Sequence, residues 1–205
     1  MLGSDLDIGD YLDHLRDELT RVDRGAVRQL ADLVYQAWER EKFVFLFGNG
    51  GSATTASHLA EDLGKNCLSE AALDYRSDGS HRRLKVLSLT DNTGWLTALG
   101  NDLGYEQVFV QQLMHYAAAG DLVVAISGSG NSPNVLAAVD WANRRDLITF
   151  GMTGYDGGRL RELQQHGLHV ALDDMAMVES IHLAVCHWVV DDLSARINGE
   201  GRYRA

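Results

Sequence analysis

The chain has little of what marks secreted, membrane or nucleic-acid-binding proteins. Its 205 residues include two cysteines, Cys67 and Cys186, which lack CxxC spacing and imply no disulfide framework. No apolar run approaches the roughly 20 residues of a membrane span, and the N-terminus lacks the basic and apolar segments of a leader. We therefore expect an intracellular, cytoplasmic protein with no membrane partner.

Basic residues are also scarce. Lysine and arginine number 18 against 29 acidic residues, which gives a formal net charge of −11, and they form no run. This balance argues against nucleic acid and anionic membranes as partners. With 45% hydrophobic residues, the chain can bury one substantial core, so we expect a single domain over residues 1–205.

A first glycine-rich turn follows five consecutive apolar residues at positions 43–47. Such a run predicts a strand covered on both faces, as in parallel sheets. The glycines of residues 48–51 allow a sharp turn, and Ser52 is positioned to cap the helix expected over residues 52–65. A helix start offers free N–H groups to an anion or a sugar hydroxyl, although one such turn alone could be purely structural.

A second turn of the same kind makes a purely structural explanation less attractive. The apolar strand at 121–126 leads into the serine-rich residues 127–132 and then a helix over 133–145, where Ser132 and the single proline, Pro133, form a start signal. Three hydroxyls and successive backbone N–H groups there predict a phosphate site that needs no lysine or arginine.

The remaining chain alternates strands and helices. Strands are expected at 84–89, 147–152 and 168–172, and helices at 93–100, 105–119, 158–166 and 174–197, with a long loop at 66–83. This order predicts a parallel sheet with helices on both faces, whose glycine and serine turns share one edge. Two amphipathic helices at 5–21 and 23–41 precede the core at 42–205. We expect them to cover the core or pack against another subunit.

Ionisable residues occur on two of these helices. His58 and Asp62 are one turn apart, with Glu61 also in reach, a spacing found in metal and acid–base sites but also in ordinary helix pairs. On the last helix, Glu179 and His187 are roughly 80° apart around the axis and could converge on one site. We interpret His182 as a core or interface histidine, and Cys186 as structural.

Together these motifs resemble the sugar isomerase (SIS) family, most closely its phosphoheptose isomerases. The resemblance covers nearly the whole chain in order. It rests on residues 48–52, His58 with Asp62, residues 100–102, residues 127–132, residues 153–158, and Glu179 with His182 and His187.

The resemblance implies a flavodoxin-like, three-layer α/β/α fold with a five-stranded parallel sheet. It implies a homotetramer with sites at subunit interfaces, and conversion of sedoheptulose 7-phosphate to D-glycero-D-manno-heptose 7-phosphate through an enediol. The implied phosphate contacts are Ser127, Gly128, Ser129 and Ser132. The implied sugar contacts are Asn49, Gly50, Gly51, Ser52, Asn101 and Asp102. The implied Zn²⁺ ligands are His58, Asp62, Glu179 and His187.

Two positions depart from the family pattern. The family has Glu, its catalytic base, where this chain has Asp62, and Gln where it has Glu179. The shorter Asp62 loses about 1.5 Å of reach, so the base is Asp62, Glu179 after the exchange, or Glu61. His187 would relay the hydroxyl proton.

The alternatives are a regulatory SIS module and a nucleotide-binding protein. A non-catalytic SIS module would bind a sugar phosphate or a protein for regulation, but such relatives lose the histidine and carboxylate set that this chain keeps. A nucleotide-binding Rossmann protein is disfavoured because the turn lacks GxGxxG spacing and strand 84–89 ends without an acidic residue.

Overall fold

A five-stranded, all-parallel sheet forms the centre of the computed structural model, which describes residues 2–76 and 81–204. The strands lie in the order β2-β1-β3-β4-β5, as the flavodoxin-like prediction requires. They are β1 (Phe43–Gly48), β2 (Lys85–Ser88), β3 (Leu122–Ser127), β4 (Ile148–Thr153) and β5 (His166–His169). Gly48 at the end of β1 pairs with Ile126 near the end of β3, which places the two predicted turns side by side.

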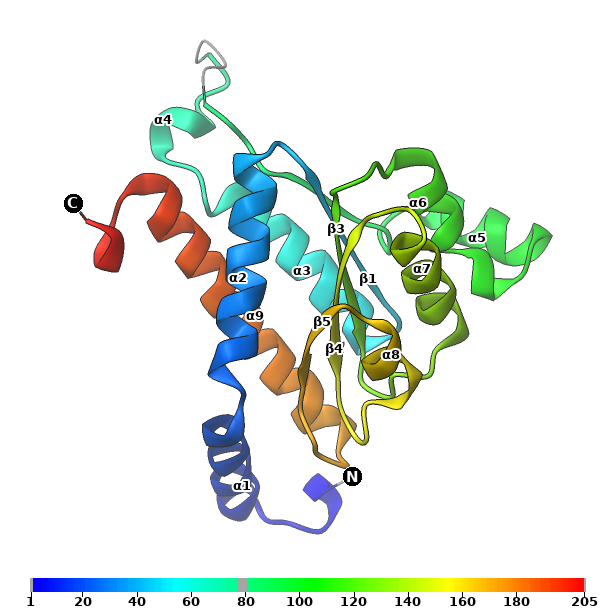
Figure 1. Ribbon diagram of the computed structural model, residues 1–205. Coiled ribbons are helices and arrows are strands. Elements are labelled where there is room, and N and C mark those ends of the chain that lie inside the picture. The colour runs from blue at the N-terminus through cyan, green and yellow to red at the C-terminus, as the bar shows by residue number, and fades with distance from the viewer. Residues whose placement is uncertain (1, 77–80, 205) are drawn as a thin grey trace.

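Helices cover both faces of the sheet, and the three-layer prediction is confirmed (Figure 1). One face packs against α2 (Arg24–Glu39), α3 (Gly51–Lys65) and α9 (Met175–Asn198). The other packs against α5 (Thr93–Asp102), α6 (Val110–Tyr116), α7 (Pro133–Asn143) and α8 (Gly158–Leu163). Alternate residues of β1 serve the two layers: Leu46 packs with the first set and Phe47 with the second.

The N-terminal helices differ in how they are covered. Helix α2 packs against α9 and the sheet, whereas α1 (Ile8–Arg21) extends away from the body of the molecule (Figure 1). Asp7 and Asp23 begin the two helices by accepting backbone N–H bonds. Leu15 of α1 packs against Val178 and Ile181 of α9, but Ile8 is 73% and Leu12 54% exposed, so part of the apolar face of α1 is open to solvent.

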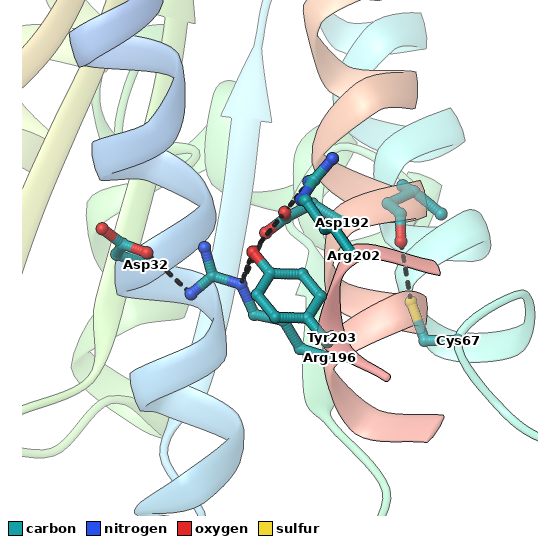
Figure 2. Close-up of polar contacts among 7 residues, drawn as sticks. Asp32, Cys67, Asp192, Arg196, Arg202 and Tyr203 are labelled. Atoms are coloured by element: carbon teal, nitrogen blue, oxygen red, sulfur yellow. Dashed lines mark hydrogen bonds and ion pairs between the residues drawn. The ribbon is translucent and has the colours of Figure 1, made fainter. Parts of the chain in front are cut away.

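A buried carboxylate fixes the C-terminal end of α9. The Asp192 side chain is fully inaccessible to solvent and pairs with Arg196, Arg202 and the Tyr203 hydroxyl (Figure 2). Arg196 also reaches Asp32 of α2 at 2.6 Å. The last short turn, η3 (Gly201–Tyr203), is thereby held against α9.

The structure corrects several element predictions. Helix α3 begins at Gly51 with Gly50 (φ +56°) as its N-cap, so Ser52 lies inside the first turn and caps nothing. The loop 66–83 contains the short helix α4 (Glu70–Leu73), capped by Ser69, while residues 77–80 lie outside the described residues. The predicted helix 105–119 divides into η2 (Tyr105–Gln107) and α6. Smaller differences are the earlier ends of α7 and α8, the earlier position of β5, and the shift of Asn101 and Asp102 into α5.

Both cysteines are free and buried, and burial raises the pKa of each thiol to about 12. This agrees with the structural role predicted for Cys186. No helix in residues 2–76 and 81–204 has the length and apolar character needed to cross a membrane.

Candidate active site

A cavity of about 240 Å³ opens where β1 and β3 end. Both predicted turns line it, together with Met175 and Glu179 from the start of α9. The residues from the turns and the adjoining end of β3 are Asn49, Gly50, Gly51, Ser52, Ile126, Ser127, Gly128, Ser129 and Ser132. The backbones approach closely, because a Cβ on Gly48 would lie 2.6 Å from the Ile126 carbonyl oxygen. The structure therefore brings the two turns into one site.

The serine turn, residues 127–132, leaves its hydroxyl groups able to bond to a ligand. Ser132 is the N-cap residue of α7 and Pro133 its first residue, as predicted, but the Ser132 side chain makes no capping hydrogen bond. Its Oγ instead lies 3.4 Å from Ser127 Oγ. No lysine or arginine is among the described residues that line the cavity, so hydroxyls and the positive end of α7 provide the attraction for an anion.

A pair of asparagines joins the two turns. Asn49 and Asn134 exchange two amide hydrogen bonds, each 2.9 Å long. Asn49 Oδ1 also accepts a 3.1 Å bond from the Tyr105 hydroxyl. Neither Tyr105 nor Asn134 was expected from the sequence, because both follow helix-boundary signals and belong to no charged cluster.

A second feature lies further along α3 and α9. His58, Asp62 and His187 each offer a ligand atom, and these atoms lie within 4.8 Å of one another. Asp62 Oδ2 is 3.4 Å from His58 Nε2 and 4.0 Å from His187 Nε2. The carboxylate is buried and the two histidines are exposed. Two imidazole nitrogens and one carboxylate oxygen fit zinc and leave a coordination position for a water or a substrate oxygen. We call these three residues the His/Asp cluster.

Glu179 does not belong to the His/Asp cluster within one chain. Its carboxylate lies over the first turn, since a Cβ on Gly51 would be 2.2 Å from Glu179 Oε2. Among the described residues that line the cavity, Glu179 is the one carboxylate. The convergence of Glu179 with His187 is thus not found in the single chain: eight residues of helix separate them by about 12 Å along the axis.

The other predicted residues have clear positions. Glu61 is exposed and pairs with Lys65 at 2.8 Å, and this bond lowers the Glu61 carboxyl pKa. His182 is buried with Nε2 3.3 Å from the Thr153 carbonyl oxygen, and burial lowers its pKa to about 4, so the core interpretation is confirmed. Asn101 and Asp102 are exposed, bond to each other at 2.7 Å and do not line the cavity.

Comparison with known proteins identifies the family. The SIS domain family model matches residues 10–154, more than half of the chain. The chain belongs to the SIS domain family. A phosphoheptose isomerase from Geotalea uraniireducens (strain Rf4) is 37% identical over 173 residues, 84% of this chain and 86% of that protein.

Solved structures agree with this SIS-family assignment. Phosphoheptose isomerase GmhA from Neisseria gonorrhoeae has a TM-score of 0.78 and 30% identity, over 89% of this chain and 92% of its own. A phosphoheptose isomerase from Francisella tularensis has a TM-score of 0.80 and 25% identity, over 91% and 96%. The predicted family and fold are confirmed.

Proposed function

We propose that the chain is an aldose–ketose isomerase that converts sedoheptulose 7-phosphate to the corresponding heptose 7-phosphate. The isomerase class follows from the relatives, which are phosphoheptose isomerases and which this chain matches over most of their length. The observation that carries the assignment is one cavity lined by both the serine turn and Glu179. The His/Asp cluster lies further along α3 and α9, the two helices whose first turns border this cavity. A regulatory SIS module would need the serine turn but neither Glu179 in the cavity nor the His/Asp cluster.

The serine turn would bind the phosphoryl group. Ser127, Ser129 and Ser132 offer hydroxyls, and the start of α7 offers backbone N–H groups. A phosphate held there directs the carbon chain of the sugar away from α7, toward Glu179 and the His/Asp cluster. Fixing one end of the substrate in this way orients the reacting carbons for proton transfer.

Glu179 is the base that the geometry favours. It faces the cavity, whereas the Asp62 carboxylate faces two histidines. Glu179 would remove a proton from C1 of the ketose. The electron pair of the C–H bond forms the C1–C2 double bond, and the C2 oxygen gains a proton to give the enediol. Glu179 returns its proton to C2 while the O1 proton is lost to water, which also supplies the proton gained by the C2 oxygen, and the product is the aldose.

His58, Asp62 and His187 would hold a zinc ion. Bound zinc would polarise the sugar carbonyl as a Lewis acid. We assign His187 to this role rather than to the proton relay, because its Nε2 faces Asp62 Oδ2. Asp62 then serves as the charged ligand of the cluster and Glu179 as the base, which gives each of the two departures from the family pattern a function.

The direct test is incubation with sedoheptulose 7-phosphate, with and without Zn²⁺, followed by detection of the aldose product. We expect turnover, greater with zinc. A thermal-shift response to the sugar phosphate without turnover would favour the regulatory module instead. Normal turnover by the Asp62→Ala, Glu179→Ala double variant would remove both carboxylates from the mechanism.

We also propose that α1 packs against other copies of the chain in a tetramer. Its support is the uncovered apolar side of α1, which includes Ile8, Leu12 and Leu19. A groove of about 310 Å³ lined by Leu19, Val27 and Trp188, among others, continues this surface. Light scattering should find a tetramer for the wild type and a smaller species for the Ile8→Glu, Leu12→Glu variant. The proposed sugar contacts of Asn101 and Asp102 fit a site completed by a neighbouring copy.

A further inference from the structure

The residue that follows α3 contacts the His/Asp cluster on the side of Asp62 away from the histidines. Asn66 is the C-cap of α3, one helical turn beyond Asp62. Its side-chain Nδ2 lies 2.6 Å from Asp62 Oδ1. An ionised carboxylate can only accept hydrogen bonds, so the amide must donate here. The two oxygens of Asp62 therefore have separate neighbours: Oδ1 has Asn66, and Oδ2 has His58 and His187.

The backbone around Asn66 is fixed to α9, the helix that carries His187. The Asn66 N–H donates to the Asp62 carbonyl at 2.8 Å. The adjacent Cys67 thiol contacts the Val190 carbonyl oxygen at 3.6 Å (Figure 2), and the Cys67 carbonyl accepts a 3.3 Å bond from Asn198. The donor on Asn66 is thus held in a fixed position relative to both helices that form the cluster.

A neutral donor has a particular consequence at this position. An arginine or lysine would neutralise Asp62 and compete with a metal for its charge, whereas an amide orients the carboxylate and leaves its negative charge available. Asp62 also has one fewer rotatable bond than the glutamate that the family pattern has there, so a single hydrogen bond fixes its direction.

We propose that Asn66 is a positioning residue that aims Asp62 Oδ2 into the His/Asp cluster. The inference rests on the proposed function for its catalytic consequence, and on the cluster geometry for its effect on metal binding. Hydrogen-bonding partners of metal ligands typically account for about 10- to 100-fold in metal affinity or activity.

The test compares Asn66→Leu, which has a similar size and no donor, with Asn66→Gln, which keeps the amide. Asn143→Leu is the matched control: the half-buried Asn143 side chain donates to the Leu163 carbonyl and accepts from the Thr149 hydroxyl, but on the opposite side of the sheet from the cluster. For each full-length variant, the Zn²⁺ dissociation constant is measured by competition with a chromophoric chelator. Steady-state kcat and KM for sedoheptulose 7-phosphate and the metal-free melting temperature complete the set.

We expect Asn66→Leu to weaken Zn²⁺ binding and to lower kcat by about 10- to 100-fold, with KM changed by less than about threefold because the phosphate end is intact. Asn66→Gln should recover part of both losses. Asn143→Leu should lower the melting temperature without a comparable loss of Zn²⁺ affinity or kcat.

Wild-type Zn²⁺ affinity and kcat in Asn66→Leu would overturn the positioning role, as would equal losses in the control. A wild type that binds zinc without turnover contradicts the proposed function alone, and the Zn²⁺ measurement then decides the role of Asn66. If the wild type turns over without zinc, the kcat of Asn66→Leu decides the positioning role of Asn66. Absence of both activities contradicts both proposals.

Discussion

Two buried aspartates on neighbouring helices have opposite surroundings. Asp192 of α9 is fully enclosed and contacts two guanidinium groups and a phenol, those of Arg196, Arg202 and Tyr203. Asp62 of α3 is also buried, but its partners are two histidines and the Asn66 amide. Both carboxylates are largely or fully buried, and of the two, Asp192 is the one paired with permanent positive charge.

Under the proposed function, this difference separates a structural aspartate, Asp192, from a metal-binding aspartate, Asp62. A buried carboxylate needs compensation, and arginines supply it at every accessible pH. That compensation leaves no capacity for another cation. The imidazoles around Asp62 can be neutral, and neutral imidazole with carboxylate is a metal-binding combination. Glu179 is a third case, since it faces the cavity and forms no ion pair with a described residue.

The largest expected effect comes from removing the carboxylate of Glu179. Glu179→Gln keeps the shape of the side chain but cannot accept a proton, so kcat should fall about 10²- to 10⁴-fold. The melting temperature and KM should change little, because the proposed phosphate contacts remain. Steady-state kinetics with sedoheptulose 7-phosphate measure this directly. Unchanged kcat in Glu179→Gln would return the role of base to Asp62.

The next largest effect should come from Asp192. Asp192→Asn leaves two arginines without a buried counter-charge and should reduce the free energy of unfolding by about 3 kcal/mol. Urea denaturation measures the change. The matched variant Asp32→Asn loses only the half-exposed pair with Arg196 and should cost less than about 1 kcal/mol.

Zinc affinity sharpens the same comparison. It should be unchanged in folded Asp192→Asn and strongly reduced in Asp62→Asn. A loss of zinc binding in both variants would show that the two carboxylates are not functionally separate.

A smaller effect should appear in the pH dependence of stability. Burial lowers the pKa of His182 to about 4 from the ordinary 6.5, so the unfolded chain binds a proton that the folded chain rejects between these values. The stabilisation is complete above pH 6.5 and is lost as the pH falls toward 4, by at most about 3 kcal/mol.

Urea denaturation at several pH values should show this slope, and His182→Gln should flatten it. The burial of His169, which also lowers the pKa of that residue, leaves a residual slope of the same sign. An unchanged slope in His182→Gln would assign the whole effect to other groups.

The strands and the serine turn could be predicted because their signals are local. Five apolar residues at 43–47 leave little alternative to a covered strand, and Ser132 with Pro133 marks the start of α7. The start of α3 was predicted at Ser52 and not at Gly51, because Gly50, with φ +56°, provides the turn without a side-chain cap. A four-residue helix such as α4 is too short to show a period.

Within the single chain, one predicted grouping of site residues does not form, for a geometric reason. Glu179 and His187 were placed together by their angle around the helix, which ignores the rise of about 12 Å over eight residues. His58 and Asp62 are one turn apart, so angle and rise agree and the structure brings them together. Asn66 is likewise one helical turn from Asp62. Its contact was not predicted, because an asparagine at the end of a helix is usually interpreted as a cap.

Zinc titration of the wild type, Glu179→Gln and Asp62→Asn in parallel tests the central claim most directly. The separation of metal ligands from the base predicts about one zinc per chain, bound equally well by wild type and Glu179→Gln, and a large loss of affinity in Asp62→Asn. Equal losses in the two variants would mean that Glu179 is itself a metal ligand, and would contradict the account.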